Sequence, residues 1–184
     1  FYAAHGQSIA KLQAGQSGKV KGASYQSSVL CPVPLFHATG THAIFLLSFL
    51  LGRKIVLMYK WDPLRALQLI ESEKITSFTG VPTMSMELLR HPHFGSFNTS
   101  SLKSIGGGGA APPKALSLET AQRGKQAGQG WGLTESNALT VNTMSSTEYV
   151  DNPSSCGRPF PLVDIKIVDP EDSSIELEPN KPGE

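Results

Sequence analysis

The pattern of apolar and polar positions divides the chain near residue 28. Residues 1–28 are rich in Gly, Ser, Gln and Lys and show no sustained apolar period, which predicts an irregular lead-in. Beyond it, short β-rich runs alternate with stretches of helical period. The expected strands lie at 28–34, 54–58, 75–80 and 101–109, and the expected helices at 37–52, 62–74, 82–91 and 112–124. This alternation predicts βαβ units and an α/β fold, a mostly parallel sheet with helices on both faces.

The helix expected at 62–74 has the clearest boundary signals. Asp62 stands where an N-cap belongs, Pro63 takes the first helical position, and Leu64, Leu67 and Ile70 share one face. By the same reasoning, the apolar helix over 37–52 ends at a glycine and the helix over 112–124 opens with proline.

The last part of the chain has a different pattern. Residues 162–170 alternate apolar and polar side chains between Pro161 and Pro170, which predicts a half-exposed strand. We therefore expect a lead-in over 1–28, a partial α/β subdomain over 28–160, and the start of a β-rich subdomain over 161–184.

Charge and composition remove several classes of function. Sixteen Lys and Arg against fifteen Asp and Glu leave a formal net charge of +1, so nothing favours a nucleic acid or a membrane surface as partner. The longest apolar run, Ala43–Leu51, has nine residues including one serine, which is well below the ~20 of a transmembrane helix. Cys31 and Cys156 do not have the spacing of a disulfide framework, and we expect both to be reduced in a cytoplasmic protein.

Ligands of parallel sheets bind where strands run into helices, so four loops are candidates: 34–40, 80–82, 106–113 and 128–136. The third contains four consecutive glycines followed by Ala-Ala-Pro-Pro. Residues without bulky side chains let a flat ligand lie against the backbone, and the following helix offers free N–H groups to a phosphate. A flexible turn, or close packing of helix on sheet, explains the glycines equally well.

The fourth loop carries the sequence QGWGLTES, residues 129–136. The indole of Trp131 offers a face to a base or an acyl chain, the Thr134 hydroxyl can bond a phosphate oxygen, and Glu135 can hold Mg²⁺. The structural alternative makes Thr134 an N-cap, Glu135 a favourable charge in the first helical turn, and Trp131 a core residue.

His37 lies in the first loop, within PVPLFHATG, and could donate a hydrogen bond to a carboxylate. The alternative is a histidine that caps a turn at the edge of the core. The other histidines show no metal-binding spacing with Cys or carboxylates, so no zinc site is expected.

Five motifs in this order resemble the acyl- and aryl-CoA synthetases, which belong to the adenylate-forming, AMP-binding enzymes. The resemblance runs from about residue 28 to residue 184 and rests on PLFHATG, GGGGAAPP, QGWGLTES, CGRPFP and KPGE. The stretch VLMYKWDPLRALQLIESEKIT, followed by GVPTM, is most similar to the fatty-acyl-CoA ligases.

The resemblance implies roles for particular residues. Thr134 would contact the α-phosphate, Glu135 would bind Mg²⁺, and His37 would orient the substrate carboxylate. The adenine would lie between two sets of residues: Gly109, Ala110, Ala111 and Pro112 on one side, and Gln129, Gly130 and Trp131 on the other. The loop after Phe36 and the segment 79–83 would border the acyl pocket, and Lys60 would meet CoA.

The chain also departs from the family pattern. AGQSGKVKG, residues 14–22, lacks the composition of the Ser/Thr/Gly-rich phosphate loop and its distance from His37. The segment with the ribose-binding Asp and the C-terminal domain with the adenylation lysine do not occur in the 184 residues. The span 119–130 lacks the apolar residues of a strand, and Trp131 replaces the commoner tyrosine.

The resemblance thus implies the central part of an ATP-dependent fatty acid–CoA ligase. The cofactors and substrates would be ATP, Mg²⁺, CoA and a small carboxylic acid, and the 184 residues alone would be inactive. An aryl-acid or small-acid CoA ligase of the same family is one alternative, and a nucleotide-binding module without catalysis is another.

Overall fold

The protein is built on a seven-stranded sheet, described here from a computed structural model that covers residues 25–138, 140–143, 146–161 and 163–184. The strand order is β2-β1-β3-β4-β5-β6-β7. The strands are β1 (Ser28–Cys31), β2 (Lys54–Leu57), β3 (Ser77–Gly80), β4 (Ser104–Gly107), β5 (Gln126–Trp131), β6 (Val141–Asn142) and β7 (Arg158–Pro159). The strands β2 to β5 in this order are parallel, and β6 and β7 are antiparallel, which confirms the mostly parallel sheet.

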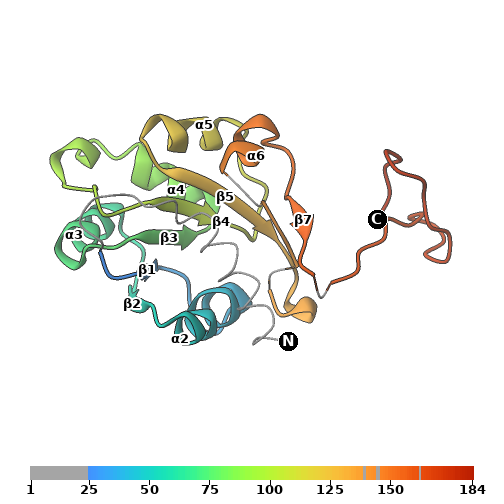
Figure 1. Ribbon diagram of the computed structural model, residues 1–184, viewed down its shortest axis with the longest axis horizontal. Coiled ribbons are helices and arrows are strands. Elements are labelled where there is room, and N and C mark those ends of the chain that lie inside the picture. Colours follow the sequence, from blue (N-terminus) through green and yellow to red (C-terminus); the bar gives the residue numbers. More distant parts are fainter. Residues whose placement is uncertain (1–24, 139, 144–145, 162) are drawn as a thin grey trace.

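Helices cover both faces of the sheet, as the sequence predicts. Figure 1 shows α3, α4, α5 and α6 along one face and α2 below the other. The helical segments are η1 (Thr39–Leu46, π-helical), α2 (Leu47–Leu51), α3 (Pro63–Glu73), α4 (Pro82–Leu89), η2 (Phe94–Ser96), α5 (Ala115–Gln122), η3 (Thr134–Ser136) and α6 (Ser146–Asp151). None of the helices among the described residues is long and apolar enough to cross a bilayer.

The alternation of side chains along the strands creates two cores. In β1, Leu30 points to the face of α3 and joins the larger cluster, which includes Leu67, Ile70 and Phe78. Val29 and Cys31 point to the opposite face and pack with Ile44 of η1 in a smaller cluster. Burial raises the pKa of the Cys31 thiol, so this cysteine behaves as a small apolar core residue.

Helix α3 forms as expected from its cap and period. The Asp62 carboxylate accepts a hydrogen bond from the backbone N–H of Arg65 at 2.8 Å, and Pro63 occupies the first turn. Ala66, Leu67 and Ile70 are fully buried, whereas Leu64 lies half-exposed at the rim of the core.

Three expectations about element boundaries are wrong. Residues 126–131 form the strand β5, which the sequence does not predict. Helix α5 begins at Ala115, after both prolines, instead of opening with Pro112. Residues 163–170 do not form the strand expected over 162–170; residue 162 lies outside the described residues, and among residues 163–184 only an isolated bridge joins Val168 to Glu176.

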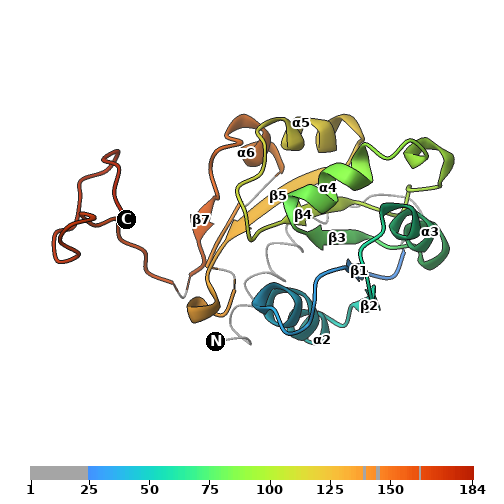
Figure 2. The same cartoon turned by 180° about the vertical axis from the view of Figure 1, so that it is seen from behind.

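Residues 163–184 extend away from the sheet and its helices (Figures 1 and 2). Their chain folds back on itself, because Val168 exchanges two backbone hydrogen bonds of 2.9 Å with Glu184. The division of the chain at residue 161 stays a prediction.

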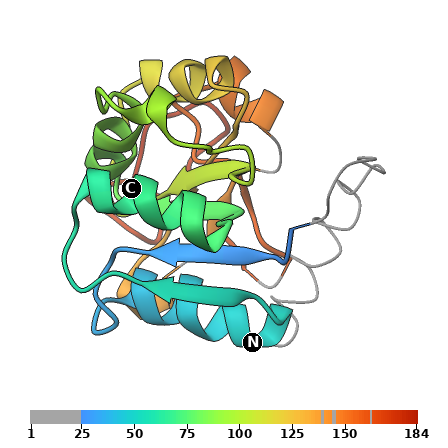
Figure 3. The same ribbon diagram turned by 90° about the vertical axis from the view of Figure 1, so that its left-hand side faces the viewer.

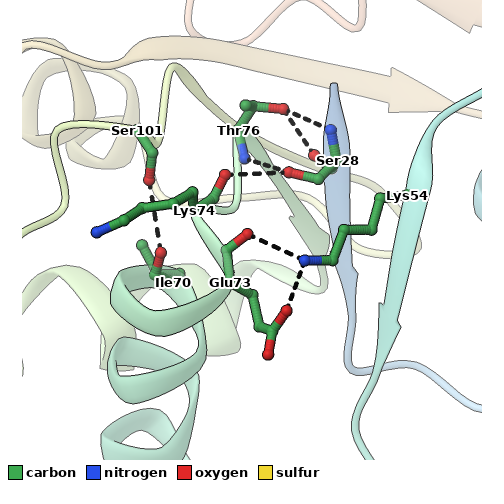
Figure 4. A network of polar contacts seen from close by, with 7 residues as sticks. All are labelled: Ser28, Lys54, Ile70, Glu73, Lys74, Thr76 and Ser101. Carbon is green, nitrogen blue, oxygen red and sulfur yellow. Dashed lines mark hydrogen bonds and ion pairs between the residues drawn. The ribbon is translucent and has the colours of Figure 1, made fainter. Parts of the chain in front are cut away.

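A polar network joins β1 to the start of β3 at the amino edge of the sheet (Figure 4). The Thr76 hydroxyl accepts from the Ser28 N–H at 2.8 Å and donates to the Ser28 carbonyl at 2.8 Å. The Ser28 hydroxyl accepts from the Thr76 N–H at 3.0 Å and donates to the Lys74 carbonyl at 3.2 Å. These bonds satisfy buried backbone groups and extend the pairing of the two strands.

Replacing Thr76 with valine is expected to lower the free energy of unfolding by about 1–3 kcal/mol, because the buried Ser28 N–H loses its acceptor. Denaturant titration of the purified chain measures this. Thr83→Val, at an exposed position of α4, is the matched control and should change stability far less. Equal effects of the two substitutions would contradict the assigned role of the network.

Candidate functional site

The carboxyl ends of the five parallel strands lie on one edge of the sheet, and all four loops expected to bind ligands leave the sheet there. In Figure 3, the neighbouring strands β1 and β2 run side by side in the same direction. The loops after β4 and β5 leave neighbouring strands, since Gly107 pairs with Gln129 across the sheet. The fold therefore brings the two glycine motifs together, although they are separated in sequence by helix α5.

The glycines at the end of β4 allow the backbone of neighbouring strands to approach. A Cβ atom at Gly107 would lie 2.3 Å from the Gly80 carbonyl oxygen of β3, and one at Gly108 would lie 2.8 Å from the Gly130 carbonyl oxygen of β5. Both distances are shorter than a carbon–oxygen contact, so only glycine fits at these positions. At the carboxyl edge of the sheet, the end of β4 therefore presents backbone without side chains at Gly107 and Gly108.

Beyond these glycines the loop turns outward into α5. Gly109, Ala110 and Ala111 are exposed and Pro112 is half-buried. Helix α5 is fixed to α4 by Arg90, whose guanidinium donates to both carboxylate oxygens of Glu119 at 2.9 and 2.6 Å. These hydrogen bonds lower the pKa of the Glu119 carboxyl, as expected for an exposed bidentate pair.

A pocket opens between this loop, α5 and the face of β4 and β5. Its lining combines apolar side chains and glycine backbone with the polar side chains of Ser85, Thr120, Gln129 and Tyr149; the other lining residues are Pro82, Ile105, Gly106, Gly107, Ala110, Pro112, Leu116, Ala127 and Gly128. Three of the predicted adenine-binding residues, Ala110, Pro112 and Gln129, thus share one cavity. Tyr149 is almost completely buried, and burial raises the pKa of its hydroxyl.

Gln129 carries a polar atom of the pocket that lacks a partner. Its side-chain Oε1 is buried and makes no hydrogen bond within the described residues. Its backbone is held firmly, since the Gln129 N–H donates to the Thr143 hydroxyl at 3.0 Å and its carbonyl accepts from the Thr143 N–H at 2.9 Å. A buried amide oxygen without a donor costs stability, which favours a ligand or solvent donor at this point.

The loop after β5 presents its side chains to solvent. The Ser136 hydroxyl accepts from the Leu133 N–H and donates to the Leu133 carbonyl, both at 3.0 Å, which closes the short helix η3. Thr134 and Glu135 are exposed, and their side chains make no hydrogen bond to any residue that the structure describes. The structural alternative for this motif is therefore wrong in two respects: Leu133 is the N-cap, and Trp131 is 47% exposed instead of buried in the core.

His37 lies at the same edge, after β1. Its ring Nδ1 accepts a hydrogen bond from the backbone N–H of Thr39 at 3.2 Å, and the backbone N–H of His37 donates to the Pro34 carbonyl at 3.1 Å. The ring therefore does order its turn, as the alternative reading holds. Because Nδ1 is the acceptor, the neutral ring carries its proton on Nε2, and the exposed side chain can offer this N–H to a carboxylate. Phe36 beside it is almost fully exposed.

Lys60 is the predicted site residue that the fold places farthest along the edge from the glycine loops. It follows β2, which the order of the sheet separates from β4 by β1 and β3. At about 4.8 Å per strand, the ends of β2 and β4 are roughly 14 Å apart. Lys60 is exposed and lies closer to the His37 loop than to the two glycine motifs.

Several residues that line the pocket lie outside the motifs, and the sequence alone does not indicate them. Tyr149 lies on α6, and Leu116 and Thr120 lie on α5; Thr143, after β6, does not line the pocket but holds the backbone of Gln129, which does. None belongs to a recognisable motif, and only the antiparallel return of the chain beside β5 brings Thr143 and Tyr149 to this place.

Among the predicted site residues, Glu135 is the one that could offer a carboxylate to a magnesium ion. Among the described residues, no group of three or more His, Cys, Asp or Glu side chains could hold a metal by itself. Mg²⁺ is commonly held by one or two carboxylates together with substrate phosphates. The exposed carboxylate of Glu135 fits a metal that arrives with a nucleotide and does not fit a permanent protein-bound ion.

Comparison with known proteins agrees with this arrangement. The family described as AMP-binding enzyme matches residues 3–184. The long-chain-fatty-acid–CoA ligase of Bacillus subtilis is 35% identical over 149 residues, 80% of this chain and 26% of the relative. The 4-coumarate–CoA ligase 1 of Solanum tuberosum is 32% identical over 162 residues, 85% of this chain and 29% of the relative.

A solved structure matches the whole fold. The o-succinylbenzoate CoA synthetase of Bacillus subtilis in complex with AMP superposes with a TM-score of 0.78 and 26% identity, covering 100% of this chain and 35% of that chain. The chain thus spans between about a quarter and a third of the length of these relatives.

Proposed function

Since the chain belongs to the family of AMP-binding enzymes, we propose that it is the nucleotide-binding core of an acid–CoA ligase that activates a fatty acid. In the first step, an oxygen of the acid's carboxylate attacks the α-phosphorus of ATP, and the bond to the β-phosphate breaks to release pyrophosphate. In the second, the CoA thiol adds to the carbonyl carbon of the acyl-adenylate, and AMP leaves with loss of the thiol proton. The complete enzyme yields an acyl-CoA thioester.

The observation that carries this proposal is the meeting of two loops at the ends of β4 and β5. In the proposal, the adenine lies between Gly109–Pro112 and Gln129–Trp131, against bare backbone. The exposed hydroxyl of Thr134 then reaches the α-phosphate, and Glu135 reaches the metal of the nucleotide. Bound Mg²⁺ would neutralise charge that develops on the phosphate oxygens.

His37 acts by positioning. Its Nε2–H donates to the substrate carboxylate and holds that group in line with the α-phosphorus, while Nδ1 stays bonded to the backbone of its own turn. The segment 79–83 and the residues after Phe36 border the acyl chain. Lys60, at the far end of the edge, meets CoA in the second step.

Gln129 supplies the specific contact to the base. The exocyclic amine of adenine is a donor, and the buried Oε1 of Gln129 is an acceptor without a partner among the described residues. Replacing Gln129 with leucine is expected to weaken ATP binding by the complete polypeptide about tenfold, from the loss of one hydrogen bond in a dry site. Calorimetric titration measures the dissociation constant.

The same substitution should leave the free energy of unfolding unchanged or raise it, because an unsatisfied polar atom is removed. Gln122→Leu, at the exposed end of α5, is the control and should not alter nucleotide binding. If Gln129→Leu reduced stability and left affinity unchanged, the amide would be a structural group.

The test of the whole proposal is acid-dependent exchange between ATP and pyrophosphate. The complete polypeptide should catalyse it with medium- or long-chain fatty acids, whereas the 184-residue chain should not, because it lacks groups that stabilise the transferring phosphate. Exchange by the 184-residue chain alone would refute the second statement. Nucleotide binding without exchange for any acid would refute the first.

A ligase for an aromatic acid is the second candidate. The observation in its favour is the 32% identity to 4-coumarate–CoA ligase 1, close to the 35% identity to the fatty-acid ligase. The same exchange assay with cinnamic-type acids beside fatty acids separates the two, since the preferred acid gives the larger kcat/KM.

A further inference from the structure

Two lysines lie side by side at the amino edge of the sheet, the edge opposite the loops of the candidate site. Lys103 and Lys125 directly precede β4 and β5, and the Gln126 N–H donates to the Lys103 carbonyl at 2.8 Å. The next residues, Ser104 and Gln126, are partners in the parallel pairing, and neighbouring strands lie about 4.8 Å apart. The two lysine side chains therefore leave the sheet on the same side, and like charges in that arrangement are unfavourable.

The turn before β4 holds both amino groups. The Nζ of Lys125 donates to the Thr99 carbonyl at 2.6 Å, and the Nζ of Lys103 donates to the Ser100 carbonyl at 2.9 Å. Because the two carbonyls belong to consecutive residues, the amino groups are also close to each other. Lys103 is exposed, whereas Lys125 is half-buried. Carbonyl acceptors orient the two amino groups but do not supply a negative charge.

The carboxylates near this edge of the sheet have other partners. Glu71 accepts from the Asn98 N–H at 2.7 Å, Glu73 pairs with Lys54 at 2.5 Å, and Glu119 pairs with Arg90 at 2.6 Å. No further ion pair is found among the residues that the structure describes. Within that part of the chain, Lys103 and Lys125 thus face each other without a carboxylate between them.

The surroundings of Lys125 favour its neutral form. Burial first, and the charge of Lys103 second, lower the pKa of the Lys125 amino group. Arg123 is a further cation at this edge, and its guanidinium carbon lies 4.5 Å from the centroid of the Phe94 ring. Near pH 7 a larger fraction of Lys125 is therefore the neutral amine than for a lysine in water, and the neutral amine is the nucleophile.

We propose that Lys125 is a site of acylation, at which its amino group takes an acyl group from a thioester. The nitrogen attacks the carbonyl carbon of the thioester, the carbon–sulfur bond breaks, and the thiolate leaves with the proton that the nitrogen gives up. The resulting amide keeps one N–H for the Thr99 carbonyl and no longer repels Lys103. The class of donor rests on the proposed function, because an acid–CoA ligase releases acyl thioesters.

Acylation by an added thioester tests this proposal. The complete polypeptide is incubated near pH 7, without ATP, with S-acetyl-N-acetylcysteamine, a neutral thioester that lacks the phosphates of CoA. Peptide mass spectrometry follows the acetylated fraction of each lysine. Lys125 should react at least about threefold faster than Lys74, an exposed lysine at the same edge, because its larger neutral fraction outweighs its partial burial. A rate at Lys125 equal to or below that of Lys74 would overturn the proposal.

The outcome is separate from that of the proposed function. Because the thioester is added and ATP is left out, acetylation of Lys125 does not require the polypeptide to make an acyl-CoA. Exchange between ATP and pyrophosphate tests the ligase activity by itself.

Lys103→Met gives a second readout. Without the neighbouring ammonium, Lys125 should be acetylated at least about twofold more slowly, because its neutral form is less favoured, and Lys74 should react as before. The neutral donor ensures that the change does not come from weaker attraction of phosphates. Lys166→Met, at an exposed position far along the chain, is the matched control and should alter neither rate. Circular dichroism checks folding, and an unchanged rate at Lys125 in Lys103→Met would contradict the role of the lysine pair.

Discussion

Replacing Gly107 with alanine is expected to lower the free energy of unfolding of the chain by about 2–3 kcal/mol, whereas Gly106→Ala should be neutral or slightly stabilising. The two glycines are neighbours in β4, but an added Cβ atom would meet a much closer backbone oxygen at Gly107 than at Gly106. A Cβ atom at Gly107 would lie 2.3 Å from the Gly80 carbonyl oxygen, and one at Gly106 would lie 3.5 Å from the Gly128 carbonyl oxygen. The first distance forces β3 and β4 apart, and the second is an ordinary contact.

Denaturant titration of the purified variants measures the difference. The comparison controls for backbone entropy, because replacing glycine with alanine lowers the conformational entropy of the unfolded chain by a similar amount at either position. The pairing of Gly80 with Gly107 lies directly below the proposed adenine site, so Gly107→Ala should also weaken nucleotide binding. Equal stability of the two variants would mean that the sheet can relax at this edge.

Replacing Glu135 with glutamine is expected to reduce kcat for acid-dependent ATP–pyrophosphate exchange by the complete polypeptide about 10²–10³-fold. Glutamine keeps the size of the side chain and removes the charge that is proposed to hold Mg²⁺. The structure predicts little effect on stability, because Glu135 is exposed and makes no hydrogen bond to a described residue. The loss should therefore be catalytic, with an unchanged melting temperature.

A titration with Mg²⁺ distinguishes a metal ligand from a residue that only orders its loop. For a ligand, the concentration of Mg²⁺ that gives half-maximal exchange should rise in Glu135→Gln. The control is Glu176→Gln, an exposed carboxylate in the extended segment after residue 163, which should leave exchange unchanged. A normal Mg²⁺ dependence in Glu135→Gln would remove this residue from the metal site.

The elements with regular apolar period could be predicted from the sequence, and the exceptions have physical causes. Helix α3 follows its cap, its proline and its apolar stripe, and β1 to β4 follow their apolar residues. Strand β5, with the sequence QAGQGW, has almost no strand propensity of its own. It forms because β4 on one side and β6 on the other supply its hydrogen bonds, which no local pattern reveals.

The opposite error occurred at residues 162–170. Their alternation is that of a strand, but a strand needs a continuous neighbour, and residues 163–184 provide only an isolated bridge of Val168 to Glu176 and two backbone hydrogen bonds between Val168 and Glu184. Helix α5 starts late because Pro113 accepts through its carbonyl from Leu116 in a preceding turn, so the prolines lead up to the helix without joining it.

The positions of the site residues depended on the motif resemblance more than on local pattern. The sequence places the loops at the strand ends, and the sheet confirms that they share one edge. The unpaired Oε1 of Gln129 and the pocket under α5 are properties of packing, because they depend on β6 and α6 returning beside β5. The Nδ1 bond of His37 is instead a local bond within its own loop.

The weak strand β5 also has a consequence for how the protein assembles. Because its own residues have little strand propensity, we expect β5 to be ordered only when β6 pairs beside it. A polypeptide that ends before β6 should therefore keep the pairing of β1, β2, β3 and β4 and lose order in the loop that carries Trp131 and Thr134.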